Sequence, residues 1–290
     1  MFSTPSCISI ISARVADKHL DTPEGPAIFR LRDHIERLFL SCRVYRMEMS
    51  FTADELVEAC CAAVEKNSLG ACYVRPMAVR GYGAVGMLPF DSPLHVFIPA
   101  WPWGTYLGQE ALERGIDVCV SNWQRAEPNT FPMLAKAAGN YNNAQLIKMD
   151  AAANGYAEGI ALSPHGLVSE GSGQNFFMIR KGVIVTPPLD GSLLAGITRD
   201  TVMVLAREEG IEVREAQIPR EMLYMADEMF ITGTASEVVP IRSVDRIDVG
   251  DGKAGPVTMK LQRRYLAIVG GMEPDKRGWL THTRSAVAAK

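Results

Sequence analysis

Residues 132–141 read Pro132-Met-Leu-Ala-Lys-Ala-Ala-Gly-Asn-Tyr141, and Lys136 stands there among small and apolar neighbours. Burial disfavours the charged form of an amine, and a neutral amine is a nucleophile that forms a Schiff base with an aldehyde or a ketone. The ordinary alternative is a lysine whose stem covers apolar surface while its ammonium group stays in water. The segment alone favours that alternative, since lysine is rarely fully buried. The rest of the chain must decide between the two.

The bulk composition narrows the class of protein. A chain of 290 residues with 47% hydrophobic and 22% charged residues is typical of a globular protein with two domains of ordinary size. The net charge of -3 offers no basic field for nucleic acid. No apolar run approaches the roughly 18 residues of a membrane span. Six cysteines without a CxxC pair predict reduced thiols in a cytoplasmic protein, several of them in the core.

The pattern along the chain predicts mixed helices and strands. Thr52-Ala-Asp-Glu55 has the capping-box pattern and predicts a helix that ends near residues 67–70. Further helices are predicted over 140–154 and 198–209. Strands are predicted over 7–15, 72–79, 94–98, 116–120, 160–162, 167–169, 175–179, 183–186, 228–232 and 237–241. The fold class is therefore α/β, of the α+β type, with a smaller N-terminal domain and a strand-rich C-terminal one.

Two glycine-rich stretches separate the predicted elements. Residues 99–108 are rich in proline, glycine and aromatic residues, and are predicted to link the domains and to line a pocket. Gly81-Tyr-Gly-Ala-Val-Gly86 matches the GxGxxG pattern of dinucleotide sites. Pro89 and Pro93 exclude the helix that must follow such a site, so a flexible loop beside a pocket is the favoured interpretation.

Two other stretches are suited to an anion. Gly196-Ile-Thr-Arg-Asp200 stands at the start of a predicted helix, where amides, a hydroxyl and the helix dipole favour phosphate. A simple N-cap at Thr198 is the commoner alternative. Gly233-Thr-Ala-Ser236 offers amides and hydroxyls between two predicted strands, and its alternative is an ordinary turn.

A Schiff-base lysine that uses pyridoxal phosphate needs an acid elsewhere, which holds the pyridine nitrogen protonated. Glu170 is the candidate, because it lies in Val168-Ser-Glu-Gly-Ser-Gly-Gln-Asn175, a predicted loop whose glycines permit close approach. On its own it would be interpreted as a surface glutamate in a turn.

Taken together, these segments resemble the branched-chain amino acid aminotransferases, which are pyridoxal phosphate enzymes of fold type IV. The similarity runs from about residue 29 to residue 280. It includes Ala135-Lys-Ala-Ala-Gly-Asn-Tyr141, Ser169-Glu-Gly-Ser-Gly173, Gly196-Ile-Thr-Arg-Asp200, Gly233-Thr-Ala235, Ala71-Cys-Tyr-Val-Arg-Pro76, Pro102-Trp-Gly-Thr-Tyr-Leu-Gly108 and Gly255-Pro-Val-Thr258. Each is weak alone, but their order and spacing identify the family. The resemblance implies a small α/β domain over 1–101, a linker over 102–112 and a larger pseudo-barrel domain over 113–290 that binds the cofactor.

The resemblance also implies roles for single residues. Lys136 would form the Schiff base with pyridoxal 5'-phosphate and move the proton of the substrate. Tyr141 would bind the phenolic oxygen of the cofactor, Glu170 would pair with its pyridine nitrogen, and Leu194 would pack under its ring. The phosphate ligands would be Arg37, Ile197, Thr198 and Thr234. The substrate residues would be Tyr73, Arg75, Trp103, Tyr106, Thr234 and Ala235, with Arg75 receiving the second carboxylate of glutamate.

The implied reaction is transamination of leucine, isoleucine and valine with 2-oxoglutarate. A paralogue that binds the cofactor but is catalytically impaired is one alternative, and a D-amino acid aminotransferase or an aminodeoxychorismate lyase of the same fold is another. The family also implies a homodimer or an assembly of dimers. The chain departs from the family pattern in its first 20 residues, which lack the usual His-Tyr-Gly and Phe-Glu-Gly segments. It also departs at Gln174, where many members have glutamate.

Overall fold

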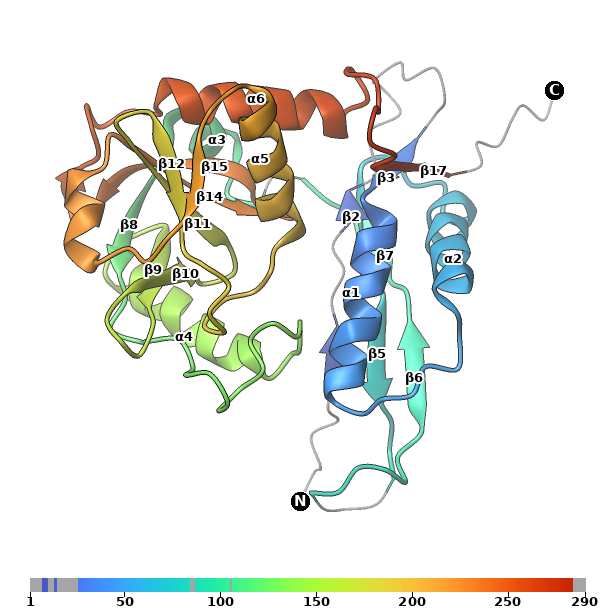
Figure 1. The fold of residues 1–290 in the computed structure, drawn as a ribbon. Coiled ribbons are helices and arrows are strands. Elements are labelled where there is room, and N and C mark those ends of the chain that lie inside the picture. The colour runs from blue at the N-terminus through green and yellow to red at the C-terminus, as the bar shows by residue number, and fades with distance from the viewer. Residues whose placement is uncertain (1–6, 10–12, 15–25, 84–86, 105, 284–290) are drawn as a thin grey trace. The chain divides into compact units, whose positions relative to one another are not determined.

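The computed structural model describes residues 7–9, 13–14, 26–83, 87–104 and 106–283, and they divide into two compact units (Figure 1). Unit 1 comprises Met1–Gly104, Ala135–Gly139 and Ala267–Lys290, and unit 2 comprises Thr105–Leu134 and Asn140–Leu266. The five residues around Lys136 therefore belong to unit 1, although the chain on both sides of them belongs to unit 2. The domain limits expected near residues 101 and 113 stay a prediction, because compactness does not define an independently folding domain.

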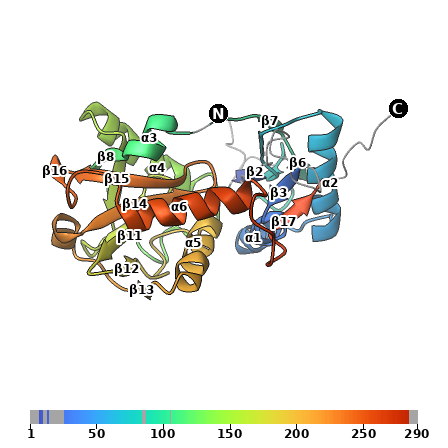
Figure 2. The same ribbon diagram turned by 90° about the horizontal axis from the view of Figure 1, so that it is seen from above.

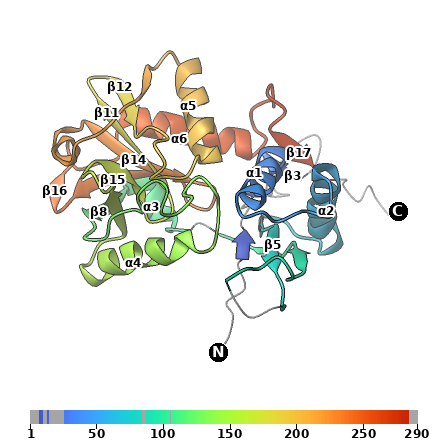
Figure 3. The same ribbon diagram turned by 60° about the horizontal axis from the view of Figure 1, so that its bottom comes forward.

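The described residues of unit 1 form three small antiparallel sheets and two long helices. The first sheet contains β1 (Cys7–Ser9), β5 (Met77–Arg80) and β6 (Leu94–Phe97), and the second contains β2 (Ala13–Arg14), β4 (Cys72–Val74) and β7 (Ala100–Pro102). The third pairs β3 (Ala27–Phe29) with β17 (Leu280–His282). Helices α1 (Leu31–Val44) and α2 (Ala53–Lys66) pack against each other and against these strands (Figures 1 and 3).

The predicted capping box begins α2. The amide of Glu55 donates to the hydroxyl oxygen of Thr52 at 3.2 Å, and the amide of Thr52 donates to the carboxylate of Glu55 at 2.7 Å. Each side chain thus satisfies a backbone donor that has no partner within the helix.

Two predictions for the strands of unit 1 need correction. The segment predicted as one strand over 72–79 is two strands, separated by Arg75 and Pro76, which join different sheets. Proline donates no backbone hydrogen bond and restricts the residue before it, so one ladder cannot continue through this point. The strand predicted over 7–15 is likewise two short strands, β1 and β2, and residues 10–12 and 15 lie outside the described residues. The GxGxxG stretch is described only to Gly83, and residues 87–93 form turns and bends.

The core of unit 1 includes three cysteines, as the composition predicts. Cys42, Cys60 and Cys72 are buried among the apolar side chains of α1, α2 and β4. Burial raises the pKa of Cys42 and of Cys72 to about 11 and that of Cys60 to about 12. These thiols stay protonated at neutral pH and act as small apolar side chains.

Six strands of unit 2 close into a ring. Their order is β10 (Val168–Gly171), β9 (Glu158–Leu162), β8 (Ile116–Val120), β15 (Glu237–Val244), β14 (Glu228–Gly233) and β11 (Asn175–Arg180), and β11 pairs with β10 again. The sheet is extended by β12 (Val183–Thr186), β13 (Val213–Glu215) and β16 (Ile247–Asp248). The pseudo-barrel that the resemblance implies is therefore confirmed.

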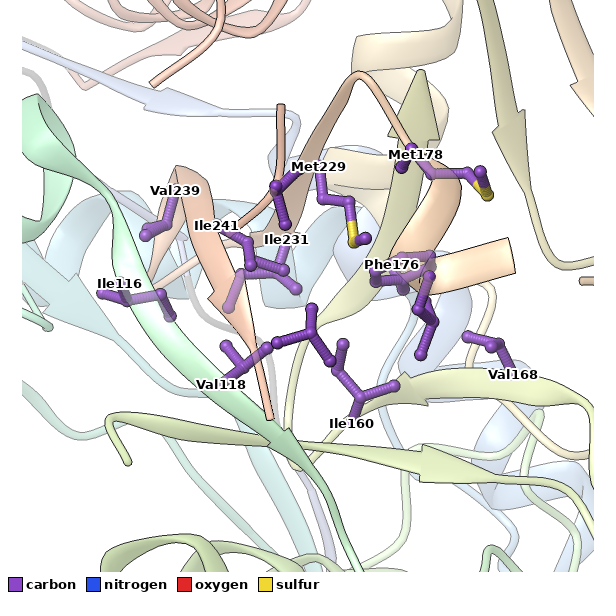
Figure 4. Close-up of a cluster of buried hydrophobic side chains, with 14 of the residues drawn as sticks. Ile116, Val118, Ile160, Val168, Phe176, Met178, Met229, Ile231, Val239 and Ile241 are labelled. Atoms are coloured by element: carbon purple, nitrogen blue, oxygen red, sulfur yellow. The ribbon is translucent and has the colours of Figure 1, made fainter. Parts of the chain in front are cut away.

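The inside of this ring is apolar (Figure 4). Every second residue of a strand faces inward, because side chains alternate between the faces of a sheet. The labelled inward side chains are Ile116, Val118, Ile160, Val168, Phe176, Met178, Met229, Ile231, Val239 and Ile241. Burial of one such side chain is worth about 1.5–3 kcal/mol, which makes the ring a firm support for the residues at its rim.

The described residues of unit 2 form the helices α3 (Gln109–Arg114), α4 (Asn140–Ala153), α5 (Ile197–Glu208) and most of α6 (Pro256–Val269), whose last three residues belong to unit 1. A 3₁₀ helix runs over Arg220–Met225. The amides of Val257 and Thr258 at the start of α6 donate to the carboxylate of Glu228 on β14. The amide group of Gln262 then donates to the Leu112 and Val238 carbonyl oxygens, which fixes α6 along α3 and β15 (Figure 2). Of the helices formed by the described residues, none is long and apolar enough to cross a membrane.

Candidate active site

Glu170 lies in strand β10, and its surroundings correct two expectations. The predicted glycine-flanked loop is a strand with a register shift just before Glu170, and the side chain is only 5% exposed. The alternative of a surface turn glutamate is therefore wrong. Its carboxylate accepts hydrogen bonds from the Asn175 side chain and the Leu194 amide, both at 3.3 Å. A buried carboxylate with fixed donors is suited to hold a cationic ring nitrogen.

Arg125 completes this arrangement, and nothing in the sequence pattern pointed to it. Its Nη2 lies 3.2 Å from Oε1 of Glu170, and both side chains are almost fully buried. The same nitrogen donates to the carbonyl oxygens of Gly171 and Ser172 at 2.6 and 2.7 Å, while Nη1 donates to Asn143 at 3.0 Å. The guanidinium thus holds both the carboxylate of Glu170 and the backbone of the two residues that follow it. No local signal could have found this residue, because its ion-pair partner stands in a distant part of the sequence.

Leu194 is held beside the same carboxylate. Its amide donates to Glu170, and its carbonyl oxygen accepts a hydrogen bond from Asn175 at 2.8 Å. Asn175 is itself fixed in β11 opposite Thr232 of β14. The structure therefore brings together two residues, Glu170 and Leu194, that the sequence predicted for the ring of one cofactor.

The start of α5 has the form expected for an anion site. The N-cap is Gly196, which has no side-chain capping bond, and Thr198 is the second residue of the helix and 3% exposed. The alternative of a threonine N-cap is therefore wrong. A Cβ atom at position 196 would lie 1.9 Å from Oδ1 of Asn175, so only glycine fits there.

The turn between β14 and β15 provides the second group of donors. It contains Thr234 and Ala235, both half-buried, and α5 packs on β14 beside it. Oγ of Ser236 is buried and has no hydrogen-bond partner among the described residues. A buried hydroxyl without a partner is costly, and an oxygen of a bound anion would satisfy it. Ser236 extends the predicted set, and its position in the Gly233–Ser236 stretch was the signal for it.

In unit 1, one face of α1 carries three polar residues spaced by three and four positions. Oγ of Ser41 accepts a hydrogen bond from the amide of Lys136 at 3.0 Å and donates to the Arg37 carbonyl oxygen at 2.8 Å. Nη2 of Arg37 donates to Nδ1 of His34 at 3.4 Å. Arg37 and Lys136, which the sequence predicted for one site, are thereby held by the same helix.

His34 is a neutral imidazole in this cluster. Burial lowers its pKa well below the usual value, and the positive charges of Arg37, Lys136 and Arg30 lower the pKa further. The folded protein therefore does not take up a proton that the unfolded chain binds at about pH 6.5. The stability that neutral His34 contributes is fully present above pH 6.5 and is lost as the pH falls towards the folded-state pKa.

We expect His34→Gln to reduce the loss of stability in acid. Below pH 6.5 the free energy of unfolding of the wild type should fall by up to about 1.4 kcal/mol more per pH unit than that of the variant. Urea unfolding between pH 5 and pH 8 measures this difference. Replacing the exposed His165 by glutamine is the control, and an equal effect of both substitutions would contradict the assignment.

The strands β4 and β7 present an aromatic face. Tyr73 on β4 is opposite Trp101 on β7, and the two rings have centroids 5.1 Å apart. The ring of Trp103 lies 5.1 Å from that of Tyr73, and the guanidinium of Arg75 lies over the Tyr73 ring at 5.1 Å. The sequence predicted three of these residues and missed Trp101, although its alternation with Trp103 was a usable signal.

The predicted site residues are distributed over both units. Unit 1 holds Arg37, Tyr73, Arg75, Trp103 and Lys136, and unit 2 holds Tyr106, Tyr141, Glu170, Leu194, Ile197, Thr198, Thr234 and Ala235. Tyr141 is half-buried at the start of α4, and Tyr106 is 46% exposed. The individual roles of these residues remain predictions.

Comparisons with known proteins settle the family. The model of amino-transferase class IV matches residues 22–244. The chain is 49% identical over 261 residues to a branched-chain-amino-acid aminotransferase of Escherichia coli (strain K12), covering 90% of this chain and 84% of that one. This chain belongs to the class IV aminotransferases. A crystal structure of the Escherichia coli branched-chain enzyme has a TM-score of 0.90 at 47% identity, and it matches over 97% of this chain and 90% of that one.

A second relative of known structure contains a form of the cofactor. The T.th. branched-chain amino acid aminotransferase with pyridoxamine 5'-phosphate has a TM-score of 0.89 at 43% identity, over 97% of this chain and 90% of that one. The class is pyridoxal phosphate-dependent. The residues of this aminotransferase fit such a group, because Ser236 offers an unsatisfied buried hydroxyl, Gly196 leaves the start of α5 open and Glu170 is a buried carboxylate.

Gln174, the second departure from the family pattern expected from the sequence, lies against a buried glutamate. Its Nε2 donates to the fully buried Glu158 at 3.1 Å, and its Oε1 accepts a hydrogen bond from the Gly173 amide at 3.0 Å. Lys148 donates to the same Glu158 carboxylate at 3.0 Å. A glutamate at position 174 would bring a second carboxylate against Glu158, whereas the amide of glutamine donates a hydrogen bond to that carboxylate and adds no charge.

Proposed function

We propose that this chain transfers the amino groups of leucine, isoleucine and valine to 2-oxoglutarate, which yields branched-chain 2-oxo acids and glutamate. The observation that carries the proposal is the face of β4 and β7, where Arg75 lies on the rings of Tyr73 and Trp101. Aromatic rings suit aliphatic side chains, and a guanidinium suits the second carboxylate of glutamate.

The relatives support both halves of this specificity. The first relatives in sequence are branched-chain-amino-acid aminotransferases from Escherichia coli, Salmonella typhimurium and Pseudomonas aeruginosa, at 44–49% identity. The T.th. enzyme has structures complexed with 4-methylvaleric acid and with N-(5'-phosphopyridoxyl)-L-glutamate. An aliphatic acid and a glutamate derivative therefore both bind to that protein.

We further propose which residues hold the cofactor. Its phosphate would lie between the start of α5 and the turn after β14, on the Ile197 and Thr198 amides, the Thr234 hydroxyl and the Arg37 guanidinium. Tyr141 would bind its phenolic oxygen, and Leu194 would support its ring. When bound, pyridoxal phosphate supplies an electron sink for the electrons that the substrate Cα leaves behind.

The chain's own groups do the rest of the chemistry. The amine of Lys136 would hold the cofactor at its aldehyde group as a Schiff base, and as a free base it would move the proton of the substrate Cα. Glu170, which is ion-paired with Arg125, would favour a proton on the ring nitrogen of the bound cofactor. The backbone of Thr234 and Ala235 would hold the substrate carboxylate.

We also propose the cellular location, the small-molecule partners and the oligomeric state of the protein. We place it in the cytoplasm, where the buried thiols of unit 1 stay reduced. Its partners would be amino acids and 2-oxo acids, and a homodimer or an assembly of dimers is expected.

The purified holoenzyme tests the proposed function. With 2-oxoglutarate as acceptor, L-leucine should give 4-methyl-2-oxopentanoate and L-glutamate, and L-leucine alone should bleach the visible absorbance of the bound cofactor. Absorbance without bleaching would instead indicate a protein that binds the cofactor but is impaired. Bleaching by D-alanine alone would indicate a D-amino acid enzyme.

A further inference from the structure

Trp101 holds a central position on the aromatic face of β4 and β7. It is the direct cross-strand partner of Tyr73, and β7 forms the edge of the sheet with the order β2-β4-β7. Tyr73 and Trp101 are cross-strand partners, and Arg75 and Trp103, each the first residue after its strand, both lie against the Tyr73 ring. Trp101 therefore lies between the tyrosine, the second tryptophan and Arg75.

The guanidinium of Arg75 lies over two aromatic rings, those of Tyr73 and Trp101. The carbon Cζ of its guanidinium lies 5.1 Å from the centroid of Tyr73 and 5.3 Å from that of Trp101. Its backbone amide donates to Pro99, whereas its buried Nε has no hydrogen-bond partner among the residues that the structure describes. A guanidinium placed over two aromatic faces is fixed in orientation, while the donors along its edge stay directed away from the rings.

The Trp101 ring is in turn fixed by Trp103. The two indoles meet edge to face, with centroids 6.1 Å apart and planes at 80°. Trp103 is also 5.1 Å from Tyr73, so three rings and one guanidinium form a closed cluster. Within this cluster Trp101 contacts Arg75 and Tyr73 at once, and its removal would release the guanidinium on one side.

We propose that Trp101 is a specificity-determining residue, which holds the guanidinium of Arg75 for the side-chain carboxylate of glutamate and 2-oxoglutarate. The inference rests on the proposed function and deepens it. An aliphatic side chain needs apolar ring surface, which Tyr73 and Trp103 also supply. A carboxylate needs the N–H edge of Arg75 in one fixed orientation. Loss of Trp101 should therefore weaken recognition of the acidic substrates and spare the branched-chain ones.

The experiment compares two unreactive acids on the holoenzyme. Glutarate represents the five-carbon diacid, and 4-methylvaleric acid represents the leucine side chain; titration calorimetry gives a Kd for each with wild type, Trp101→Phe and Trp101→Leu. We expect Trp101→Leu to raise the glutarate Kd about tenfold, which corresponds to about 1.4 kcal/mol. The Kd of 4-methylvaleric acid should change less than about threefold.

A graded series and a matched control guard against a folding effect. Tryptophan gives the strongest cation–π contact, so Trp101→Phe should raise the glutarate Kd by a smaller factor, about two- to threefold. Trp279→Leu removes another indole of unit 1 that is stacked with arginines, Arg30 and Arg277, and it should leave the ratio of the two Kd values unchanged.

The outcomes separate the inference from the proposed function. Equal weakening of both acids by Trp101→Leu, or weakening of neither, would overturn the role of Trp101. A wild type that fails to transaminate leucine would overturn the proposed function, whatever the two Kd values show. Steady-state kinetics provide an independent check, since KM for glutamate should rise in Trp101→Leu while KM for leucine stays within about threefold.

Discussion

Lys136→Ala should abolish transamination and remove the visible absorbance of the bound cofactor. The lysine amine is the proposed nucleophile and proton carrier, and no other group in the predicted set can take both roles. We expect kcat to fall by at least about 10⁴-fold, as for other residues on which every chemical step depends. Absorbance spectra of the reconstituted protein and single-turnover assays with L-leucine measure the two effects.

Lys253→Ala is the control for this substitution. Lys253 is exposed on a loop of unit 2. Its amine forms an exposed ion pair with Asp251, with the two charged groups 3.8 Å apart. That variant should keep the wild-type spectrum and rate. If Lys136→Ala also kept its turnover, the proposed chemistry would be wrong, because the variant keeps the backbone contact with Ser41 and loses only the amine.

Arg125→Met should lower the free energy of unfolding by about 3–5 kcal/mol. The substitution leaves Glu170 as a buried anion without its ion-pair partner, and it removes the hydrogen bonds to Gly171 and Ser172. Urea unfolding of the cofactor-free protein measures the loss. The holoenzyme should also turn over more slowly, since an unpaired carboxylate takes up a proton more readily and holds the ring nitrogen less well.

A double substitution identifies the cause of this loss. Arg125→Met combined with Glu170→Gln contains no buried unpaired charge, so it should be more stable than Arg125→Met alone. If the two substitutions instead destabilise additively, the ion pair is not what Arg125 contributes. Glu170→Gln by itself should leave a buried guanidinium without its anion, and it should weaken turnover more than stability.

Elements with local signals could be predicted from the sequence. The capping box of Thr52 and Glu55 defines α2, and the helices predicted at 140–154 and 198–209 correspond to α4 and α5. Elements that are stabilised by residues far away in the sequence could not be predicted. Helix α6 is capped by Glu228, about 30 positions earlier in the chain. Helix α1 begins after Arg30, a residue with a positive φ of 51° and no side-chain cap.

The candidate site shows the same division. Lys136, Glu170 and the two anion stretches stand in recognisable segments, so the sequence could propose them as site residues. The contacts that give them their properties come from elsewhere: Glu170 is paired with Arg125 from before α4, and the amide of Lys136 is held by Ser41, 95 positions away on α1. Trp101 was missed although it alternates with Trp103 in the sequence, because its pairing with Tyr73 is seen only in the folded sheet.

The chain passes between the two units four times, after residues 104, 134, 139 and 266. Unit 1 therefore cannot be produced alone by a single truncation of the chain. A fragment ending at residue 104 would lack β17, which leaves the edge of β3 open to pairing with other chains. It would also lack residues 135–139, so Ser41 would lose the hydrogen bond that it accepts from the amide of Lys136 in the intact protein. Residues 135–139, which carry the proposed nucleophile, thus belong to unit 1 and are joined to unit 2 at both ends.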